Sequence, residues 1–290
     1  MLSLPRLPAT TAIGAVHLRV RDLDRAIDFY TESLGLRLHH RDGNIARLGA
    51  GVSDLLVLGG APEATRPRGT TGLYHFAVLV PSRRDLARSL RHLIRRRLPL
   101  TGMSDHLVSE SLYLSDPEGN GIEVYRDRPR GEWPVVDGLL RMTTDPLDVD
   151  SLLAESGPED EPWAGFPSGT RIGHVHLHVA HLADSERFYS ELLGFELRQR
   201  FGRSALFLAA GGYHHHIGLN TWAGVGAPPP TPGSLGLRHF EVLLPDGGTF
   251  DQLLARLREA GVAVTDASDG SEAVDPSGNT VRFLAQPQSK

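Results

Sequence analysis

The sequence contains no cysteine, and this absence removes several kinds of chemistry at once. Disulfide bonds, thiolate metal sites and cysteine nucleophiles all require that side chain. Long apolar runs are also missing, because none approaches the roughly 20 residues that span a bilayer. The N-terminus has Arg6 but lacks the apolar segment of a signal peptide. We therefore expect a cytoplasmic protein without membrane contact.

A strong excess of charge is absent as well. The 290 residues include 30 Lys and Arg against 35 Asp and Glu, which gives a formal net charge of -5. This balance offers no electrostatic attraction to nucleic acid or to an anionic membrane. The chain is long enough for two domains with proper cores, and it carries 14 histidines. Without cysteine, any metal ion must be held by imidazole and carboxylate groups.

The chain contains an internal repeat. Residues 13–20 (Ile-Gly-Ala-Val-His-Leu-Arg-Val) return as residues 172–179 (Ile-Gly-His-Val-His-Leu-His-Val). Later in each copy, residues 116–120 (Asp-Pro-Glu-Gly-Asn) correspond to residues 275–279 (Asp-Pro-Ser-Gly-Asn). A duplicated chain must keep its repeated core but is free to differ where chemistry occurs. The differences that matter here fall on His, Glu and Arg.

Each repeat divides into two β-α-β-β-β modules. Alternating apolar residues over 15–20 predict an opening strand, and Asp22 and Gly35 mark the start and end of the helix that follows. Short strands then alternate with glycine-containing turns. The second module opens with residues 74–80, and Ser82 caps its helix. The pattern predicts an α+β fold of four such modules.

The helix after Ser82 has Leu86, Leu90, Leu93 and Ile94 at the spacing of a core-facing side. Its many arginines predict a solvated face. Residues 127–170 then break the pattern, since prolines and acidic residues there predict a long connection.

The predicted domains are therefore an N-terminal pair of modules over 1–126, a linker over 127–170 and a C-terminal pair over 171–290.

Two long segments resemble a known family. Residues 104–125, which include Ser-Asp-His-Leu-Val-Ser-Glu and Asp-Pro-Glu-Gly-Asn, and residues 212–222 (Gly-Tyr-His-His-His-Ile-Gly-Leu-Asn-Thr-Trp) are similar to tandem proteins of the catechol 2,3-dioxygenase type. These proteins belong to the vicinal oxygen chelate (glyoxalase, bleomycin-resistance and extradiol dioxygenase) superfamily. The resemblance implies that the four modules form two open barrels. It also implies a non-haem Fe(II) extradiol dioxygenase, with Mn(II) as the alternative ion, that inserts both atoms of O2 into catechol or a substituted catechol.

The resemblance further implies an iron site of two histidines and one glutamate. The first ligand is the His directly after Gly in an opening strand, which is His174 here, whereas the first copy has Ala15. The third ligand lies in a closing strand after the Asp-Pro-x-Gly-Asn turn, which is Glu123 here. The last copy has Arg282 instead, and a protonated guanidinium cannot bind a cation.

The second ligand precedes Phe in an opening strand, and both His75 and His239 fit. We favour the set His174, His75 and Glu123, which draws on both repeats, within one chain or across a dimer. Two other sets stay open. One is a C-terminal site that contains His174 and His239 with a substitute ligand, and the other is an N-terminal site in which His17 joins His75 and Glu123.

The resemblance also implies residues that handle protons. The acid/base histidine of the family lies on the last strand of the module that provides the first ligand. That strand corresponds to residues 213–219, where His215 is the match and His214 and His216 are alternatives. A further His and a Tyr beside the substrate oxygen correspond to His106 and Tyr113.

Other residues favour structural roles. His17 and His176 recur at one repeat position, which predicts shared packing or hydrogen bonding. Arg282 is expected to pair with Glu241 or Asp275 and to close a barrel without a metal ion.

Two other functions in the same superfamily stay open. A metal-dependent glyoxalase-type isomerase or thiol transferase would need a further ligand near His215 or on the strand over 55–58, which has no Glu. A metal-free small-molecule binding protein would need neither iron nor Glu123. With a dioxygenase as the favoured reading, the expected partners are a catechol, O2 and a second copy of the chain in a homodimer.

Overall fold

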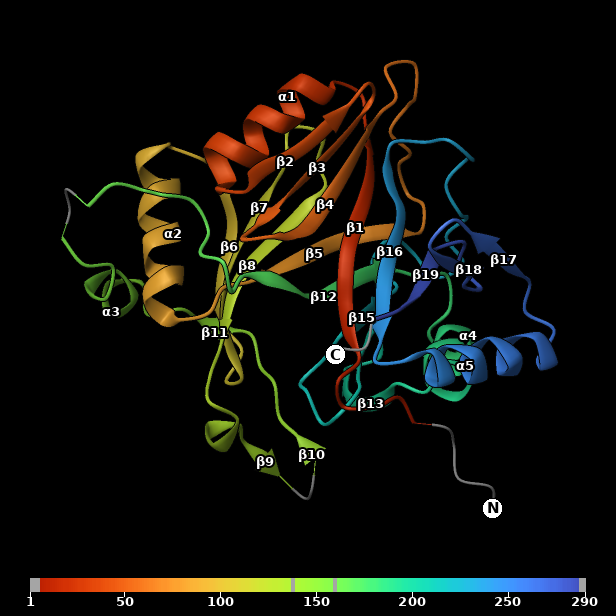
Figure 1. The fold of residues 1–290 in the computed structure, drawn as a ribbon. Coiled ribbons are helices and arrows are strands. Elements are labelled where there is room, and N and C mark those ends of the chain that lie inside the picture. The colour runs from red at the N-terminus through yellow and green to blue at the C-terminus, as the bar shows by residue number, and fades with distance from the viewer. Residues whose placement is uncertain (1–5, 137–138, 159–160, 287–290) are drawn as a thin grey trace. The chain divides into compact units, whose positions relative to one another are not determined.

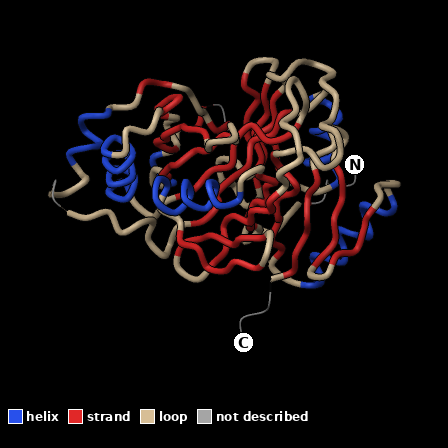
Figure 2. Tube along the Cα trace, turned by 90° about the horizontal axis from the view of Figure 1, so that it is seen from above, coloured by secondary structure: helices blue, strands red, loops and turns tan. Residues whose placement is uncertain are grey.

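The computed structural model describes residues 6–136, 139–158 and 161–286 (Figure 1). Contacts between Cα atoms divide the chain into two compact units. Unit 1 consists of Met1–His17, Arg66–Tyr74 and His174–Lys290, and unit 2 of Leu18–Thr65 and His75–Gly173. No helix among the described residues is long and apolar enough to span a membrane. Figure 2 shows that strands make up more of the described chain than helices do.

Unit 2 contains most of the first two modules. The strand β1 (Ala12–Val20) ends in this unit and β5 (Gly72–Leu79) runs mostly within it. The other elements of the two modules are α1 (Leu23–Asp28), η1 (Phe29–Leu34), β2 (Arg37–Asp42), β3 (Ile45–Ala50), β4 (Ser53–Gly60), α2 (Arg83–Arg95), β6 (Leu100–Asp105), β7 (Ser109–Ser115) and β8 (Gly121–Asp127).

Unit 1 contains the last two modules. Its elements are β12 (Arg171–His178), α4 (Leu182–Glu186), η3 (Arg187–Leu192), β13 (Glu196–Phe201), β14 (Ala205–Ala209), β15 (Ile217–Asn220), β16 (Gly236–Leu244), α5 (Gly247–Glu259), β17 (Val264–Ala267), β18 (Gly270–Val274) and β19 (Thr280–Ala285). The helix η3, like η1, is a π-helical turn that continues the helix before it.

Strand pairing is the same in the modules of both units. The opening strand pairs parallel with the closing strand, as β5 does with β8, β12 with β15, and β16 with β19. The remaining neighbours pair antiparallel, for example β6 with β7 and β7 with β8. Helix α2 packs against β8 in unit 2, and α5 packs against β16 and β19 in unit 1 (Figure 1). The predicted α+β fold of four β-α-β-β-β modules is confirmed.

The helix boundaries follow from local chemistry. The Asp22 carboxylate accepts a hydrogen bond from the Arg25 N–H at 3.0 Å, and the Ser82 hydroxyl accepts one from the Asp85 N–H at 3.2 Å. Side chains at this position pair donors that the first helical turn cannot satisfy itself. The π-helical turn η1 ends at Gly35, whose φ of 104° lies in the left-handed region that glycine adopts without strain. These three predicted boundaries are confirmed.

The predicted core side of α2 is correct for three of its four residues. Leu86, Leu90 and Leu93 are buried, whereas Ile94 is 51% exposed. The angle between Leu90 and Ile94 is a full helical turn plus about 40°, so Ile94 falls at the margin of the buried stripe.

Each Asp-Pro-x-Gly-Asn turn is hydrogen-bonded to the preceding module of its unit. Asp116 accepts a hydrogen bond from the Tyr30 hydroxyl at 2.7 Å, and Asp275 accepts one from Tyr189 at 3.0 Å. Both tyrosines are fully buried and come from the preceding module of the same repeat. Burial raises the pKa of Asp275, and hydrogen bonds from Asn279 and other donors counteract only part of this effect. The repeated turn is therefore a structural element of the core.

The segment after β8 contains regular structure among its described residues. It includes η2 (Arg130–Glu132), β9 (Val135–Val136), β10 (Leu139–Leu140), β11 (Asp145–Pro146) and α3 (Val149–Ala154). Arginines of α2 bind this segment. Arg83 donates to Glu155 at 2.5 Å, and Arg91 donates to the carbonyl of Gly157 at 2.7 Å. The prediction that the arginines of α2 form only a solvated face is wrong for these two, because polar groups distant in sequence cover them.

Candidate active site

Two of the predicted metal ligands lie in contact in unit 2. The parallel pairing of β5 with β8 places Ala77 beside Glu123 and His75 beside Gly121. The His75 Nε2 atom lies 3.0 Å from a carboxylate oxygen of Glu123. Both residues are buried, since only 6% of the surface of His75 and 2% of that of Glu123 is exposed. Burying a carboxylate costs free energy unless a partner compensates for its lost hydration. The imidazole of His75 is such a partner for Glu123.

Tyr113 and His106 extend the same group of side chains. Tyr113 lies opposite Glu123 in the antiparallel pairing of β7 with β8. Its ring centroid is 5.7 Å from that of His75. Its hydroxyl lies 2.7 Å from the Nε2 atom of His106. The structure thus brings together four predicted site residues of unit 2.

The environment of His106 fixes the direction of its hydrogen bonds. Its Nδ1 atom lies 2.6 Å from the backbone carbonyl oxygen of Thr143, which only accepts hydrogen bonds. The proton of a neutral His106 ring is therefore on Nδ1. Its Nε2 atom must then accept the hydrogen bond that the Tyr113 hydroxyl donates.

His174, the third predicted ligand, lies on β12 in unit 1. It is 1% exposed. Its ring centroid is 4.0 Å from that of His215 and 6.2 Å from that of His214. The backbone explains this proximity, because the Val175 N–H donates to the His216 carbonyl at 3.1 Å and β12 pairs with β15 from that point. The predicted acid/base histidine therefore lies against the predicted first ligand.

The three adjacent histidines have different environments. The Nδ1 atoms of His214 and His215 are 2.8 Å apart, and the His215 ring also contacts Phe207 at 4.9 Å between centroids. The His216 Nδ1 atom accepts a hydrogen bond from the Ala210 N–H at 3.1 Å. His216 therefore closes the turn between β14 and β15. This contact separates it from His214 and His215, which share a hydrogen bond beside His174.

One sequence expectation about this segment is wrong. The tract at 213–219 was expected to be a single strand that carries His215. Strand β15 begins only at Ile217, and the histidines form the turn before it. Two consecutive glycines with positive φ, Gly211 and Gly212, bend the chain there. Contacts across the turn, and not strand alternation, place His215.

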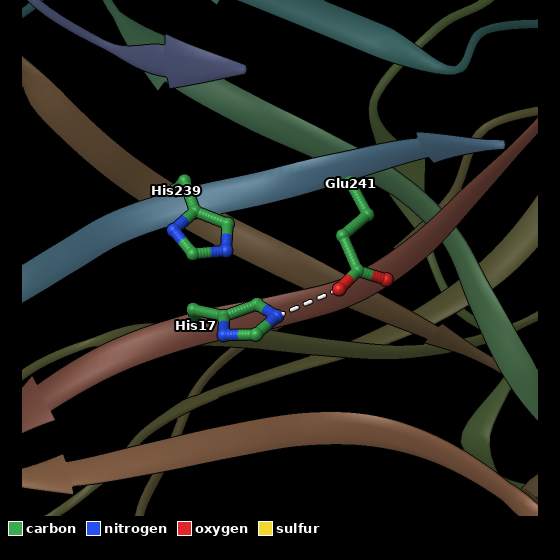
Figure 3. Close-up of side chains that lie close together, drawn as sticks. All are labelled: His17, His239 and Glu241. Atoms are coloured by element: carbon green, nitrogen blue, oxygen red, sulfur yellow. Dashed lines mark hydrogen bonds and ion pairs between the residues drawn. The ribbon is translucent and has the colours of Figure 1, made fainter. Parts of the chain in front are cut away.

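A second group of histidine and glutamate side chains lies within unit 1 (Figure 3). His17 of β1 lies with its Nε2 atom 2.8 Å from an oxygen of Glu241 on β16. The ring of His239 stacks on that of His17 at 3.9 Å between centroids. The prediction of a packing and hydrogen-bonding role for His17 agrees with these contacts. Sequence analysis missed Glu241 as a partner, and its signal was that the corresponding residue of the first repeat is Ala77.

The predicted partners of Arg282 are wrong. Its guanidinium donates to Glu272 at 2.9 Å and to Asp269 at 3.1 Å, not to Glu241 or Asp275. Strand β19 places Arg282 beside Glu272 of β18 and also beside Glu241 of β16. The Glu241 carboxylate is bound by His17 and by the Ala15 N–H, so Glu272 is the neighbour of opposite charge that pairs with Arg282.

The fold and the arrangement of histidines define the class of protein. The family model described as the Glyoxalase/Bleomycin resistance protein/Dioxygenase superfamily matches residues 12–124 and 171–283. The chain therefore belongs to this superfamily. The resemblance noted from the sequence is thus confirmed. The chain is 42% identical over 280 residues to a catechol-2,3-dioxygenase of Bacillus subtilis (strain 168), across 94% of this chain and 97% of that protein.

Solved structures with low sequence identity share the fold. A protein of Bacillus subtilis subsp. subtilis str. 168 described as a candidate dioxygenase has 15% identity and a TM-score of 0.64, over 98% of this chain and 87% of that chain. Glyoxalase I from Zea mays has 18% identity and a TM-score of 0.59, over 95% and 92% of the two chains. Since enzymes of different chemistry share this architecture, these likenesses concern the fold alone.

Proposed function

We propose that the protein is an extradiol catechol dioxygenase. It opens the ring of catechol or a substituted catechol beside the two hydroxyl groups and incorporates both atoms of O2. The observation that carries this proposal is the 42% identity to a catechol-2,3-dioxygenase over 94% of the chain. The buried groups around His75 and around His174 support it, because they supply imidazole, carboxylate and phenol side chains, which are the types of side chain that this chemistry uses.

We propose that His75, Glu123 and His174 hold the metal ion, which is the ligand set that the family resemblance implies. Two imidazoles and one carboxylate are the donors of mononuclear Fe(II) oxygenases, and they leave coordination positions open. The observed contact between His75 and Glu123 supports this set, because the two donor atoms are 3.0 Å apart. Fe(II) is the proposed ion, and Mn(II) suits the same donors. When bound, the ion supplies a positive charge that favours ionised catechol hydroxyls and a position for O2.

Tyr113 and His106 orient one oxygen of the substrate in this proposal. The Tyr113 hydroxyl donates a hydrogen bond to His106, and in this proposal its oxygen accepts one from a catechol hydroxyl. The carbonyl of Thr143 fixes the tautomer of His106, and this contact keeps the phenol in one orientation. A fixed acceptor needs no reorganisation when the substrate binds.

His215 moves protons in this proposal. Imidazole accepts and donates protons near neutral pH, and His215 lies against the ring of His174. The hydrogen bond between the Nδ1 atoms of His214 and His215 requires one ring to donate and the other to accept. The tautomers of His214 and His215 are therefore coupled, because a proton on Nδ1 of one ring requires a free lone pair on Nδ1 of the other. Phe207 also contacts the His215 ring, with 4.9 Å between the ring centroids.

The test is ring cleavage by protein loaded with Fe(II) without oxygen. Addition of catechol and O2 to the wild-type protein is expected to produce the yellow absorbance of a semialdehyde. Glu123→Ala is expected to abolish this absorbance and to lower the iron content. Arg282→Gln is the matched control, because Arg282 occupies the corresponding position of the other repeat, and it is expected to retain activity. Full activity of Glu123→Ala would contradict the proposed site, and an inactive wild-type protein that binds iron would contradict the proposed reaction.

The proposed assembly is a homodimer. Light scattering of the purified protein is expected to give twice the 31.6 kDa of one chain. A mass of one chain at micromolar concentration would contradict this expectation and would leave the proposed reaction unaffected.

A further inference from the structure

His17, His239 and Glu241 form a group of metal-binding side chains outside the proposed active site (Figure 3). All three belong to unit 1, where β1 carries His17 and β16 carries the other two. We propose that they form a second site for a divalent transition-metal ion. The inference concerns residues to which the proposed function assigns no role.

The repeat explains how such a site arises. In the repeat, Ala15 corresponds to His174, His239 to His75, and Arg282 to Glu123. Of these three positions in unit 1, only His239 offers a metal donor. His17 lies two residues after Ala15, and Glu241 lies two residues after His239. Residues two apart on a strand point to the same face. The donor missing at Ala15 is thus replaced two residues further along β1, and the donor missing at Arg282 is replaced by Glu241 on the neighbouring strand β16.

The distances in the group suit a single ion. Each of the three side chains offers a donor atom, and these atoms lie within 4.8 Å of one another. The His17 Nε2 atom is 2.8 Å from a Glu241 oxygen, and the two imidazole rings are 3.9 Å apart. Donors that each lie at the usual 2.0 to 2.2 Å from an ion are roughly 3 to 4 Å from one another. Figure 3 shows that both rings lie beside the carboxylate.

The carboxylate of Glu241 is held in place by the backbone of β1. Its second oxygen accepts a hydrogen bond from the Ala15 N–H at 2.9 Å. Gly14 makes the space for this contact, because a Cβ atom at that position would lie 2.6 Å from the same oxygen. A ligand fixed in this way loses little conformational freedom when an ion binds, which favours affinity.

The positive charge of Arg282 does not oppose a cation here. Glu272 and Asp269 bind its guanidinium. Glu272 also lies 3.7 Å from the Nδ1 atom of His239. Metal-binding histidines commonly have a carboxylate near the nitrogen that does not bind the ion, and it fixes the orientation of the ring. Glu272 therefore places a carboxylate oxygen near Nδ1 of His239 while it also binds Arg282.

A histidine–carboxylate pair elsewhere provides a matched comparison. In unit 2, His39 Nδ1 lies 2.8 Å from an oxygen of Asp54, the same distance as between His17 and Glu241. That pair is not part of a group of three or more metal-binding side chains among the described residues. The group in unit 1 adds His239, which is 1% exposed, and so offers three buried or half-buried donors. Imidazole and carboxylate together suit Zn(II), Mn(II) and Fe(II).

The test measures bound zinc and does not depend on activity. Full-length protein is stripped with a chelator, equilibrated with Zn(II) and dialysed, and the zinc per chain is measured by mass spectrometry of the metal. The wild-type protein is expected to retain two ions per chain. His17→Ala and Glu241→Gln are expected to lose one, and His39→Ala is expected to retain both. Circular dichroism checks that each variant is folded, and Glu241→Gln preserves the shape of the side chain if His17→Ala does not fold.

Glu123→Ala separates this inference from the proposed function. It is expected to lose the other ion, and Zn(II) is still expected to raise its thermal unfolding midpoint through the second site. Adding Glu241→Gln to Glu123→Ala is expected to remove this rise. Zinc binding by His17→Ala and Glu241→Gln equal to that of the wild type would overturn the second site. A single ion per wild-type chain that Glu123→Ala removes would also overturn it, while the proposed function would stand.

Discussion

Single side chains determine the direction of hydrogen bonds in the proposed active site. Nε2 of His106 accepts a hydrogen bond from the Tyr113 hydroxyl, because Nδ1 of the same ring donates to the Thr143 carbonyl. A phenol held in this way has a fixed O–H direction, and its oxygen presents its lone pairs in a fixed direction as well. In the proposed function, the two residues therefore position the substrate together beside Glu123.

Tyr113→Phe tests this device. Loss of one hydrogen bond to a charged or ionising substrate is expected to lower kcat/KM by about 10- to 100-fold, because such bonds are worth about 1.5 to 3 kcal/mol. The iron content is expected to remain that of the wild type. Steady-state ring cleavage with catechol measures the effect, and Tyr74→Phe is the control. An unchanged kcat/KM would contradict the role of the hydroxyl.

Gly173 is a residue whose lack of a side chain is structurally required. A Cβ atom there would collide with the hydroxyl of Tyr125, which is fully buried in unit 2. Gly173→Ala is expected to destabilise the protein by about 1 to 3 kcal/mol, as overpacking of a core does. Urea unfolding measures this loss. Gly131→Ala is the control, since no atom lies within 4 Å of its added Cβ atom; equal stabilities of the two variants would refute the steric argument.

At the scale of elements, a buried ion-pair network joins α2, β7 and β8. Glu110 of β7 is 2% exposed, and it accepts hydrogen bonds from Arg83 at 2.8 Å and from Arg126 at 2.7 Å. Burial alone would raise the pKa of Glu110. The hydrogen bonds and charges of the two arginines outweigh burial and lower the pKa below its ordinary value of 4.5. The ionised carboxylate therefore stabilises the contact between the helix and the sheet.

Glu110→Gln tests the network and its pH dependence. Removing one partner of a buried ion pair is expected to cost about 3 kcal/mol at pH 7. A carboxyl group with a lowered pKa contributes stability above its unfolded pKa, and this contribution is lost as the pH falls through the folded pKa. The difference in free energy of unfolding between wild type and variant is thus expected to shrink below pH 4.5. Urea titrations at several pH values measure it, and a difference that does not depend on pH would contradict the assignment.

The elements also show where sequence reasoning succeeds. Asp22, Ser82 and Gly35 were predicted correctly because a cap depends on residues three or four positions away. The strand expected over 213–219 was wrong, because two glycines and the contact between His216 and Ala210 impose a turn. The length of a strand depends on partners that the local pattern does not reveal.

At the scale of the whole molecule, bound metal is expected to contribute to stability. An ion that binds only the folded chain stabilises it by about 2.7 kcal/mol when present at 100 times its dissociation constant. A chelator is therefore expected to lower the thermal unfolding midpoint of the metal-loaded wild type. Calorimetry with and without chelator measures the shift. The variant that combines Glu123→Ala with Glu241→Gln is expected to show none, and an equal shift in that variant would mean that the chelator acts elsewhere.

The repeat and the family resemblance were sufficient to predict most of the candidate site residues. They indicated His75, Glu123, Tyr113 and His106, which lie together in unit 2, although their roles remain predictions. They did not indicate Glu241, because no family position corresponds to it. Only its difference from Ala77 marked it in the sequence.

The sequence by itself determined the four modules, the caps of their helices and the repeated turns, because each depends on residues close along the chain. Only the tertiary structure decided that Glu241 meets His17, which is 224 residues away. It also decided that Arg282 pairs with Glu272, because the carboxylate of Glu241, its other cross-strand neighbour, binds His17 and the Ala15 N–H. Such contacts follow from which strands are neighbours and in which register they pair. Many side chains contribute to that choice, so no short stretch of sequence contains it.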